Sequence, residues 1–372
     1  MINPFIITGY ISPLYFCDRE RETQKILSAI DNGRNITLLS LRRIGKTGLI
    51  KNVFYKLVNE NRYRLLYLDI MATSDTSEFV REFGKAIVKD EQKHSKKFLK
   101  KLVGFLSGIR AKLVFDEITG APEIEFDYVK TQKSESSITA IFNYLSQQKT
   151  NYVIAIDEFQ QIVNYPEKKF EALLRSFVQQ YPNIRFIFSG SNKHLLLSMF
   201  SDYGRPFYQS GEIMYLNRLE SGIYTDFIID KFRKNGRIID PELVSDILDK
   251  FDIYTFYVQF IFNRLFETGS DIISKEQVYM VLEDIITERE YIYYNYRNLL
   301  TNNQFQLLRA IAKERGVKHY SSKEFIGKYK LGTSSSVNRS LKMLLDKEMI
   351  YEESGFYKVY DLFFAHWLMK KQ

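Results

Sequence analysis

The chain lacks the features that mark membrane-spanning and secreted proteins. Its 372 residues contain no run of 18 or more apolar residues, so we expect no membrane span. The single cysteine, Cys17, cannot form an internal disulfide, and the N-terminal residues MINPFIITGY lack the basic segment of a signal peptide. Together these absences predict a cytoplasmic protein that folds without disulfides.

Histidine and proline are also scarce. The 4 histidines show no ligand spacing with the one cysteine, which argues against a structural zinc site. The 7 prolines are too few for long stiff linkers. What remains is the balance of a soluble globular protein, with 45% hydrophobic and 26% charged residues. Because 372 residues exceed what one hydrophobic core usually supports, we expect two or three domains.

The first part of the chain alternates short apolar runs with segments of helical periodicity. Helical spacing covers residues 48–58 and 77–88. The runs of strand length are residues 35–40, 64–70, 152–157, 185–190 and 212–216. Five buried strands separated by helices predict an α/β domain with a mostly parallel, doubly wound sheet over residues 1–216.

An insertion interrupts this pattern at about residues 92–133. It begins with the basic stretch KHSKKFLKKLVGFL (93–106), which predicts an amphipathic helix. Two alternating runs follow on either side of a Thr-Gly-Ala-Pro turn, which is a hairpin signal. We therefore expect a helix and a β-hairpin inserted into the α/β domain.

The second part of the chain is predicted to be helical and to end in a winged helix. Strand signals vanish after about residue 217, and we place a helical lid domain at 217–300. From 301 to 372 the pattern is three short helices and then strand–turn–strand at 349–360, which is the order of a winged helix. The helical segments expected in the lid are 223–233, 241–251, 256–266 and 275–294.

Residues 40–47 read SLRRIGKT and resemble the Walker A pattern G-x-x-x-x-G-K-[ST]. Gly45, Lys46 and Thr47 match the pattern, and Ser40 stands where the first glycine would be. A buried strand precedes the motif and an amphipathic helix follows it, as a phosphate-binding loop requires. The alternative is a basic loop capped by threonine.

This loop predicts a site for ATP and Mg²⁺. The backbone N–H groups from Ile44 to Gly48 would converge on the phosphates at a helix N-terminus. The ammonium of Lys46 would reach the β- and γ-phosphate oxygens, and the hydroxyl of Thr47 would ligate Mg²⁺.

Two adjacent carboxylates, Asp157 and Glu158, end the apolar run YVIAI. Carboxylates at the end of a buried strand are costly unless they serve a cation or a substrate. Asp157 fits the Walker B role of holding Mg²⁺ opposite Thr47, and Glu158 fits the polarisation of an attacking water. A solvated acidic turn is the alternative. The order of loop, additional strand and Asp-Glu pair points to the additional-strand class of P-loop ATPases.

The motifs SLRRIGKT, YVIAIDEFQ and FIFSGSN, in this order, resemble those of the archaeal-type ATPase family, a branch of the STAND and AAA+-related P-loop NTPases. Phe16, Arg19 and Glu22 resemble the family's F-x-x-R-x-x-E box, which precedes the P-loop and flanks the adenine. YDLFFAHWL (360–368) resembles the stretch that closes the family's winged helix. The resemblance implies a five-stranded P-loop core, a helical lid and a C-terminal winged helix.

The resemblance also implies roles for individual residues. Ser191 matches the polar position that senses the γ-phosphate, with Asn192 as a neighbouring candidate. Arg42 and Arg43 match paired arginines within the P-loop. Arg205 stands where such proteins often carry an arginine that stabilises transition-state charge in cis or in trans, and an ordinary surface salt bridge is its alternative role.

Residues 334–347 form the candidate recognition helix of the winged helix. The side chains expected to face its core are Val337, Leu341, Leu344 and Leu345, and those expected to face outward are Asn338, Arg339, Lys342 and Lys347. With 53 Lys+Arg against 45 Asp+Glu, the chain carries a net charge of +8, which is compatible with DNA as a partner. Winged helices also serve as protein-interaction modules, so both partners stay open.

These observations favour an ATP-binding P-loop ATPase with slow turnover that acts as a regulatory switch on a protein partner or on itself. One alternative is an ATP-dependent DNA-binding protein. Another is a nucleotide-binding module without turnover.

Overall fold

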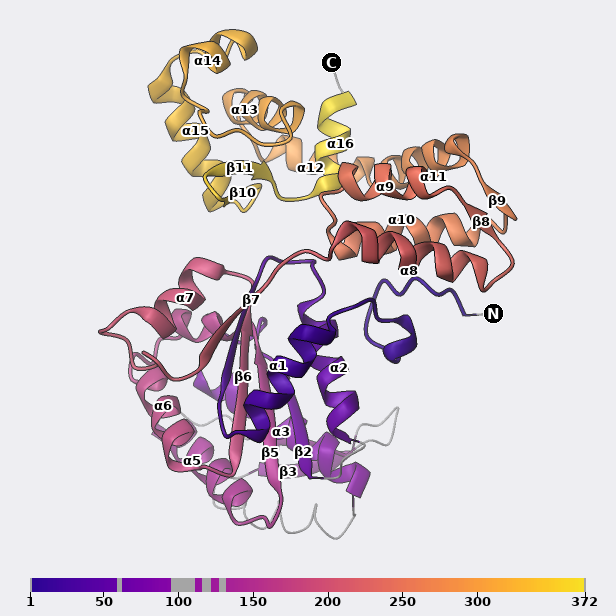
Figure 1. Ribbon diagram of the computed structural model, residues 1–372. Helices are drawn as coiled ribbons and strands as arrows, with labels where there is room; N and C mark the ends of the chain where they lie inside the picture. The colour runs from indigo at the N-terminus through magenta and orange to yellow at the C-terminus, as the bar shows by residue number, and fades with distance from the viewer. Residues whose placement is uncertain (1, 59–61, 95–110, 116–121, 127–131, 371–372) are drawn as a thin grey trace. The chain divides into compact units, whose positions relative to one another are not determined.

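The computed structural model describes residues 2–58, 62–94, 111–115, 122–126 and 132–370. The chain divides into two compact units, Thr8–Glu220 and a second that combines Met1–Ile7 with Ser221–Gln372. Figure 1 shows the elements of both units. Within the described residues, none of the helices has the length and apolar character needed to cross a membrane.

The first unit is built on a five-stranded sheet whose neighbouring strands all run parallel. Its strands are β1 (Ile36–Ser40), β2 (Tyr63–Asp69), β5 (Asn151–Asp157), β6 (Ile184–Gly190) and β7 (Glu212–Leu216). Their order across the sheet is β2-β5-β6-β1-β7. This confirms the predicted parallel α/β core of the P-loop type, in which the additional strand β6 separates the P-loop strand β1 from the Asp-Glu strand β5.

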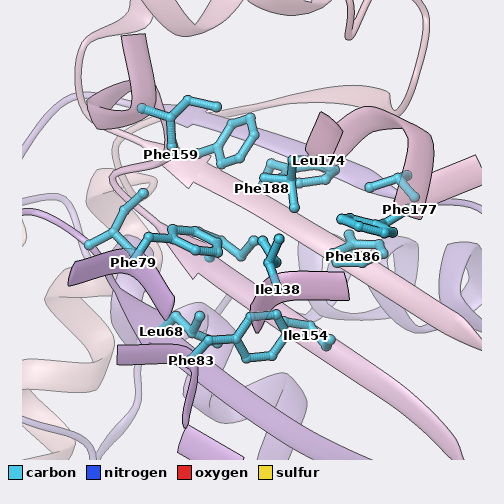
Figure 2. Close-up of a cluster of buried hydrophobic side chains, with 14 of the residues drawn as sticks. Leu68, Phe79, Phe83, Ile138, Ile154, Phe159, Leu174, Phe177, Phe186 and Phe188 are labelled. Atoms are coloured by element: carbon cyan, nitrogen blue, oxygen red, sulfur yellow. The ribbon is translucent and has the colours of Figure 1, made fainter. Parts of the chain in front are cut away.

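Helices cover both faces of this sheet. The α-helices are α1 (Glu20–Asp31), α2 (Lys46–Val58), α3 (Thr76–His94), α5 (Gln132–Ser146), α6 (Phe170–Gln180) and α7 (Lys193–Ser201), and the 3₁₀ turns are η1 (Pro13–Tyr15) and η3 (Phe159–Asn164). One face packs against α3, α5, α6 and α7 in a cluster rich in phenylalanine (Figure 2). Phe142 and Phe177 stack there with ring centroids 4.6 Å apart. Each such buried ring contributes about 1.5–3 kcal/mol, so this cluster anchors the strands that carry the site.

The predicted hairpin in the insertion is present. β3 (Ala111–Phe115) pairs antiparallel with β4 (Pro122–Phe126). The basic helix expected at 93–106 lies almost wholly outside the described residues, as does most of the turn between the two strands.

The helices of the second unit include the expected lid segments, with two corrections. They are α8 (Ser221–Arg233), α9 (Pro241–Lys250), α10 (Thr255–Glu267), α11 (Lys275–Glu288) and α12 (Glu290–Asn298). The single helix predicted for 275–294 was wrong, because the backbone breaks at Arg289, which ends α11 and precedes α12. Strands do occur after residue 217, since β8 (Ile238–Ile239) pairs parallel with β9 (Ile272–Ile273). Two residues are too few to leave an alternating pattern.

The winged-helix order is confirmed. It consists of α13 (Asn302–Lys313), α14 (Lys323–Tyr329), α15 (Ser334–Asp346), β10 (Ile350–Glu353), β11 (Phe356–Val359) and α16 (Leu362–Lys370). In α15, Val337, Leu341 and Leu344 are buried and Leu345 is partly buried, as the periodicity predicted. The expected division of this unit into 217–300 and 301–372 stays a prediction.

Candidate nucleotide-binding site

The predicted phosphate loop joins the end of β1 to the start of α2. Gly45 adopts φ +93°, a left-handed conformation that side chains with a Cβ rarely accept, and Arg43 also has a positive φ of 68°. The loop thus turns sharply, and α2 begins directly at Lys46. The first N–H groups of a helix have no partner within the helix, so this turn presents donors and a positive dipole end to an anion.

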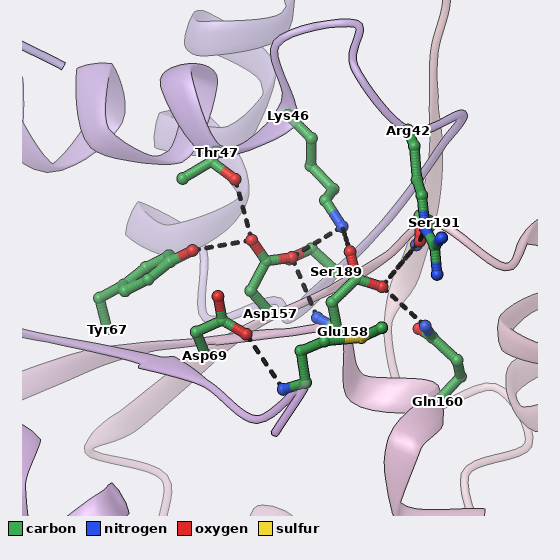
Figure 3. A network of polar contacts seen from close by, with 11 residues as sticks. Arg42, Lys46, Thr47, Tyr67, Asp69, Asp157, Glu158, Gln160, Ser189 and Ser191 are labelled. Atoms are coloured by element: carbon green, nitrogen blue, oxygen red, sulfur yellow. Dashed lines mark hydrogen bonds and ion pairs between the residues drawn. The ribbon is translucent and has the colours of Figure 1, made fainter. Parts of the chain in front are cut away.

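Lys46 lies against the predicted acidic pair (Figure 3). Its Nζ is 2.7 Å from Oδ1 of Asp157 and 2.9 Å from Oε1 of Glu158. Both Lys46 and Asp157 are buried. Burying these charges would be costly without the pairing, so each side of the contact compensates the charge of the other.

Asp157 also accepts hydrogen bonds from three hydroxyl groups, one each on α2, β2 and β6. Its Oδ2 accepts hydrogen bonds from Thr47 Oγ1 at 3.0 Å and from Tyr67 OH at 2.7 Å, and its Oδ1 accepts one from Ser189 Oγ at 2.8 Å. Burial opposes the ionisation of Asp157, but the charge of Lys46 and the hydrogen bonds from Lys46, Tyr67 and Ser189 outweigh it and hold the pKa below its usual value. The carboxylate is therefore ionised at neutral pH and fixed in direction.

Glu158 is held in a different way, through its second oxygen. Oε2 accepts hydrogen bonds from Gln160 Nε2 at 2.7 Å and from Ser191, whose N lies at 3.1 Å and whose Oγ lies at 2.8 Å. Arg42 Nε in turn donates to Ser191 Oγ at 3.1 Å. Burial would raise the pKa of Glu158, but the charge of Lys46 and the donated hydrogen bonds lower it below its usual value. The network thus joins the ends of β1, β5 and β6.

Comparison with known proteins identifies the family to which this arrangement belongs. A family model described as an ATPase domain predominantly from Archaea matches residues 16–247, and one described as a "probable winged helix domain" matches residues 291–370. The chain belongs to this archaeal ATPase family. A search of the curated proteins found no match.

Solved structures share the fold of this family member at low sequence identity. A Walker-type ATPase of Pyrococcus abyssi is 19% identical with a TM-score of 0.62, and the match covers 98% of this chain and 99% of that one. The ORC2 protein of Aeropyrum pernix, solved in ADPNP–ADP complexes, is 15% identical with a TM-score of 0.58, covering 99% and 95%. The ORC1 protein of the same organism, solved in complex with DNA, is 13% identical with a TM-score of 0.51, covering 95% and 92%. At such identities these likenesses show the fold alone.

The box predicted to precede the P-loop, Phe16, Arg19 and Glu22, packs close to the loop and the first turn of α2. The guanidinium of Arg19 is buried; Nη1 lies 2.7 Å from Glu22 Oε1, and Nη2 donates to the carbonyl of Asn217 at 2.6 Å. The ring of Phe16 lies 3.1 Å from where a Cβ on Gly48 would stand. Gly48 therefore allows Phe16 to approach α2, and the box ties the start of the unit to its last strand. Its contact with adenine stays a prediction.

Most of the predicted site residues lie in or beside this network. Lys46, Thr47, Asp157, Glu158, Ser191 and Arg42 are joined by contacts, and Arg43, Ile44, Gly45 and Gly48 lie in the loop or the first turn of α2. Ser40, which replaces the first glycine, is buried at the end of β1.

Two predicted residues are engaged elsewhere in the described structure. Arg205 Nη2 pairs with Glu171 Oε2 on α6 at 2.9 Å. The side chain of Asn192 caps α7 by accepting from Leu195 N at 3.1 Å. Arg205 is thus paired with a partly buried carboxylate, and the two roles given for it from the sequence both stay predictions.

Sequence reasoning missed four residues that the structure adds to the site: Tyr67, Asp69, Gln160 and Ser189. Asp69 lies directly opposite Asp157 in the pairing of β2 with β5. Burial raises the pKa of Asp69, and the negative charges of Asp157 and Glu158 add to that rise. The order of strands could have placed Tyr67 and Asp69 beside the Asp-Glu pair, because parallel strands end at the same edge.

Proposed function

We propose that this chain binds ATP with Mg²⁺ and hydrolyses it slowly to ADP and phosphate. The observation that carries the proposal is the contact of Lys46, at the N-terminus of α2, with both Asp157 and Glu158. The two carboxylates supply the counter-charge of this ammonium. When the β- and γ-phosphates occupy the loop, their oxygens replace the carboxylates as partners of Lys46.

The residues present also fit Mg²⁺, which prefers hard oxygen ligands. Thr47 Oγ1 and Asp157 Oδ2 lie 3.0 Å apart and offer a hydroxyl and a carboxylate. The ion would neutralise charge on the phosphates. Ser191 would sense the γ-phosphate, and Arg205 would stabilise transition-state charge in cis or from another copy of the chain.

Glu158 would then act on the attacking water. Its carboxylate accepts a proton from the water while the water oxygen bonds to the γ-phosphorus. The bond from that phosphorus to the ADP oxygen breaks, which leaves ADP and phosphate. Slow turnover of this kind suits a regulatory switch that acts on a protein partner or on another copy of the chain.

The first test is the replacement of Lys46 by alanine. We expect Lys46→Ala to weaken ATP binding sharply. Lys46 is the one buried lysine of α2, and its ammonium lies where the phosphates would bind. Lys56→Ala, in the last turn of the same helix, is the matched control and should bind ATP normally. Titration of labelled ATP against the wild-type, Lys46→Ala and Lys56→Ala proteins measures the effect.

Lys46→Ala also leaves two carboxylates without their counter-charge, so folding must be checked by circular dichroism. Lys46→Arg keeps the positive charge but replaces a compact ammonium by a planar fork, and it should also bind ATP more weakly. Equal affinities in a folded Lys46→Ala protein would refute the phosphate-loop assignment.

A second candidate function is binding of duplex DNA through the winged helix. The side chains predicted to face outward from the recognition helix are exposed, and three of them are cationic: Arg339 and Lys342 in α15 and Lys347 directly after it. A helix with this charge pattern is suited to a major groove. The DNA complex of the Aeropyrum pernix ORC1 protein supports the proposal only at the level of a shared fold.

A further inference from the structure

Gln160 lies two residues after the predicted catalytic glutamate and is buried beneath it. Its Nε2 donates to Glu158 Oε2 at 2.7 Å, the shortest of the hydrogen bonds to that oxygen (Figure 3). Glu158 itself has φ 55° and ψ 40°, a left-handed conformation that is unfavourable for a residue with a Cβ. A side chain that starts from such a backbone needs outside contacts to keep one direction.

The other end of the Gln160 amide points at Gly190, the last residue of β6. A Cβ built on Gly190 would lie 1.9 Å from Gln160 Oε1, so no other residue fits there without moving Gln160. The φ of Gly190 lies outside the left-handed region, so its backbone does not itself require glycine. The space taken by Gln160 is therefore a physical reason for a glycine at this position.

Among the residues that the structure describes, none forms a hydrogen bond with Gln160 Oε1. A buried amide oxygen without a partner costs free energy, so the position of this side chain is not set by satisfying both ends of the amide. The bond to Glu158 is the polar contact that orients it. Together these observations indicate that Gly190 and Gln160 serve the orientation of Glu158.

We propose that Gln160 is a positioning residue that fixes Glu158 by its Oε2, with Gly190 providing the space, so that Oε1 is the oxygen left to act on water. This inference rests on the proposed hydrolysis. In the structure Oε1 contacts Lys46 at 2.9 Å, while Oε2 is bound by Gln160 and Ser191. When Lys46 turns to phosphate oxygens, Oε1 loses that partner and Oε2 keeps its own.

Gln161 provides a matched control within the same 3₁₀ turn. Its side-chain amide donates to the carbonyl of Thr73 at 3.0 Å and accepts from Asn164 Nδ2, so both ends of the amide are engaged away from the Glu158 carboxylate. Both residues can be replaced by methionine, which keeps the length of the side chain and removes its donor. Only Gln160→Met should then disturb Glu158.

The experiment measures kcat for ATP hydrolysis against pH, and ATP affinity, in the full-length wild-type, Gln160→Met and Gln161→Met proteins. We expect Gln160→Met to lower kcat about tenfold, the cost of one hydrogen bond to a charged group, with unchanged ATP affinity. Because that bond favours the ionised carboxylate, the acidic limb of the pH profile should move to higher pH. Gln161→Met should change neither.

Two further variants test the role of Gly190 and guard against a misfolded Gln160→Met protein. Gly190→Ala should lower kcat and shift the pH limb in the same direction as Gln160→Met. Its loss of thermal stability should be smaller in a Gln160→Ala background, because the shorter side chain makes room for the added methyl group. Gln160→Glu keeps the side-chain volume and places a second carboxylate beside Glu158, so its acidic limb should move further.

The outcomes separate this inference from the proposed function. A wild-type protein without phosphate release overturns the proposed hydrolysis and this inference with it. An active wild type with an unchanged rate and pH profile in Gln160→Met overturns the inference alone. Equal losses in Gln160→Met and Gln161→Met, with no movement of the pH limb, would show a merely structural role and overturn it as well.

Discussion

At the scale of single residues, the site is a balance between one buried ammonium and a group of carboxylates. Asp157 and Glu158 are both held in the ionised form, while burial and their charges raise the pKa of the neighbouring Asp69. Tyr67, which donates to Asp157, also lies under the ammonium of Lys51 at 3.5 Å from the ring centroid. The different hydrogen-bond partners of the two ionised carboxylates predict different roles for them.

Replacing each carboxylate by its amide should separate these roles. Glu158→Gln should keep its ATP and Mg²⁺ affinity and lose about 10²–10⁴-fold in turnover, which is the usual contribution of a positioned base. Asp157→Asn should instead weaken the dependence on Mg²⁺, because the oxygen opposite Thr47 loses its charge. Phosphate release across a Mg²⁺ titration measures both effects.

Asp69→Asn decides whether a third carboxylate takes part. Asp69 ends β2 and lies opposite Asp157, at the edge of the sheet where the strands end. We expect it to hydrolyse ATP at nearly the wild-type rate. A large loss in Asp69→Asn together with an unchanged rate in Glu158→Gln would assign the water to Asp69.

At the scale of elements, α16 places a histidine inside the second unit. His366 is buried, and its ring centroid lies 4.8 Å from that of Phe251. The charged groups that act on it are Lys250 at the end of α9 and Arg315 just beyond α13. Burial and these two positive charges lower the pKa of His366 to about 4.

This shift predicts an acid-dependent loss of stability. The unfolded histidine takes up a proton near its ordinary pKa of 6.5, whereas the folded one stays neutral down to about pH 4. Between these values only the unfolded state gains the proton, so the free energy of unfolding falls as the pH falls through that window. The loss would reach about 3 kcal/mol at its low end.

Urea unfolding at a series of pH values measures this loss. The only tryptophan of the chain, Trp367, is the next residue of α16, so its fluorescence reports this unit. His366→Gln should flatten the dependence between pH 6.5 and 4. The exposed His319, replaced in the same way, should leave it unchanged. An equally steep dependence in His366→Gln would contradict the assignment.

At the scale of the whole molecule, the candidate ATP site and the winged helix belong to different compact units. A ligand at one can influence the other only if it binds two arrangements of the chain unequally. The net charge of +8 favours attraction to a polyanion but gives no position for it. The exposed cations of α15 supply such a position, and they can be tested directly.

Reversing the charge of Arg339 and Lys342 together should weaken binding of duplex DNA. Each lost phosphate contact removes about 0.9 from the slope of log K against log salt concentration, so the slope should fall by up to about two units. Fluorescence anisotropy across a salt series, with and without ATP, measures the slope and any effect of the nucleotide.

The matched control reverses Arg233 and Lys234, two exposed residues at the end of α8. This double reversal changes the net charge by the same amount as the reversal of Arg339 and Lys342. It therefore separates the loss of a local contact with DNA from the effect of the overall charge of the protein. Absence of binding at low salt, where charges are least screened, would eliminate the DNA proposal and favour a protein partner.

The sequence by itself determined the elements and the motifs, because both depend on neighbours along the chain. Apolar periodicity predicted the five sheet strands and most of the helices, and the short spacing in SLRRIGKT placed Gly45, Lys46 and Thr47 between a strand and a helix. The Asp-Glu pair was recognisable because it ends an apolar run. The break at Arg289 and the two-residue strands escaped prediction because neither changes the pattern of apolar residues.

Only the tertiary structure decided which side chains meet at the site. Tyr67 and Asp157 are 90 positions apart, and parallel pairing of β2 with β5 brings them together. The fit of Gln160 against Gly190 depends on the close packing of η3 on β6, and no spacing along the chain encodes it. For Arg205 the sequence left a catalytic role and a salt bridge open, and its pairing with Glu171 on α6 is a contact that no spacing along the chain indicates. Such contacts arise from the packing of distant segments, which a local pattern does not contain.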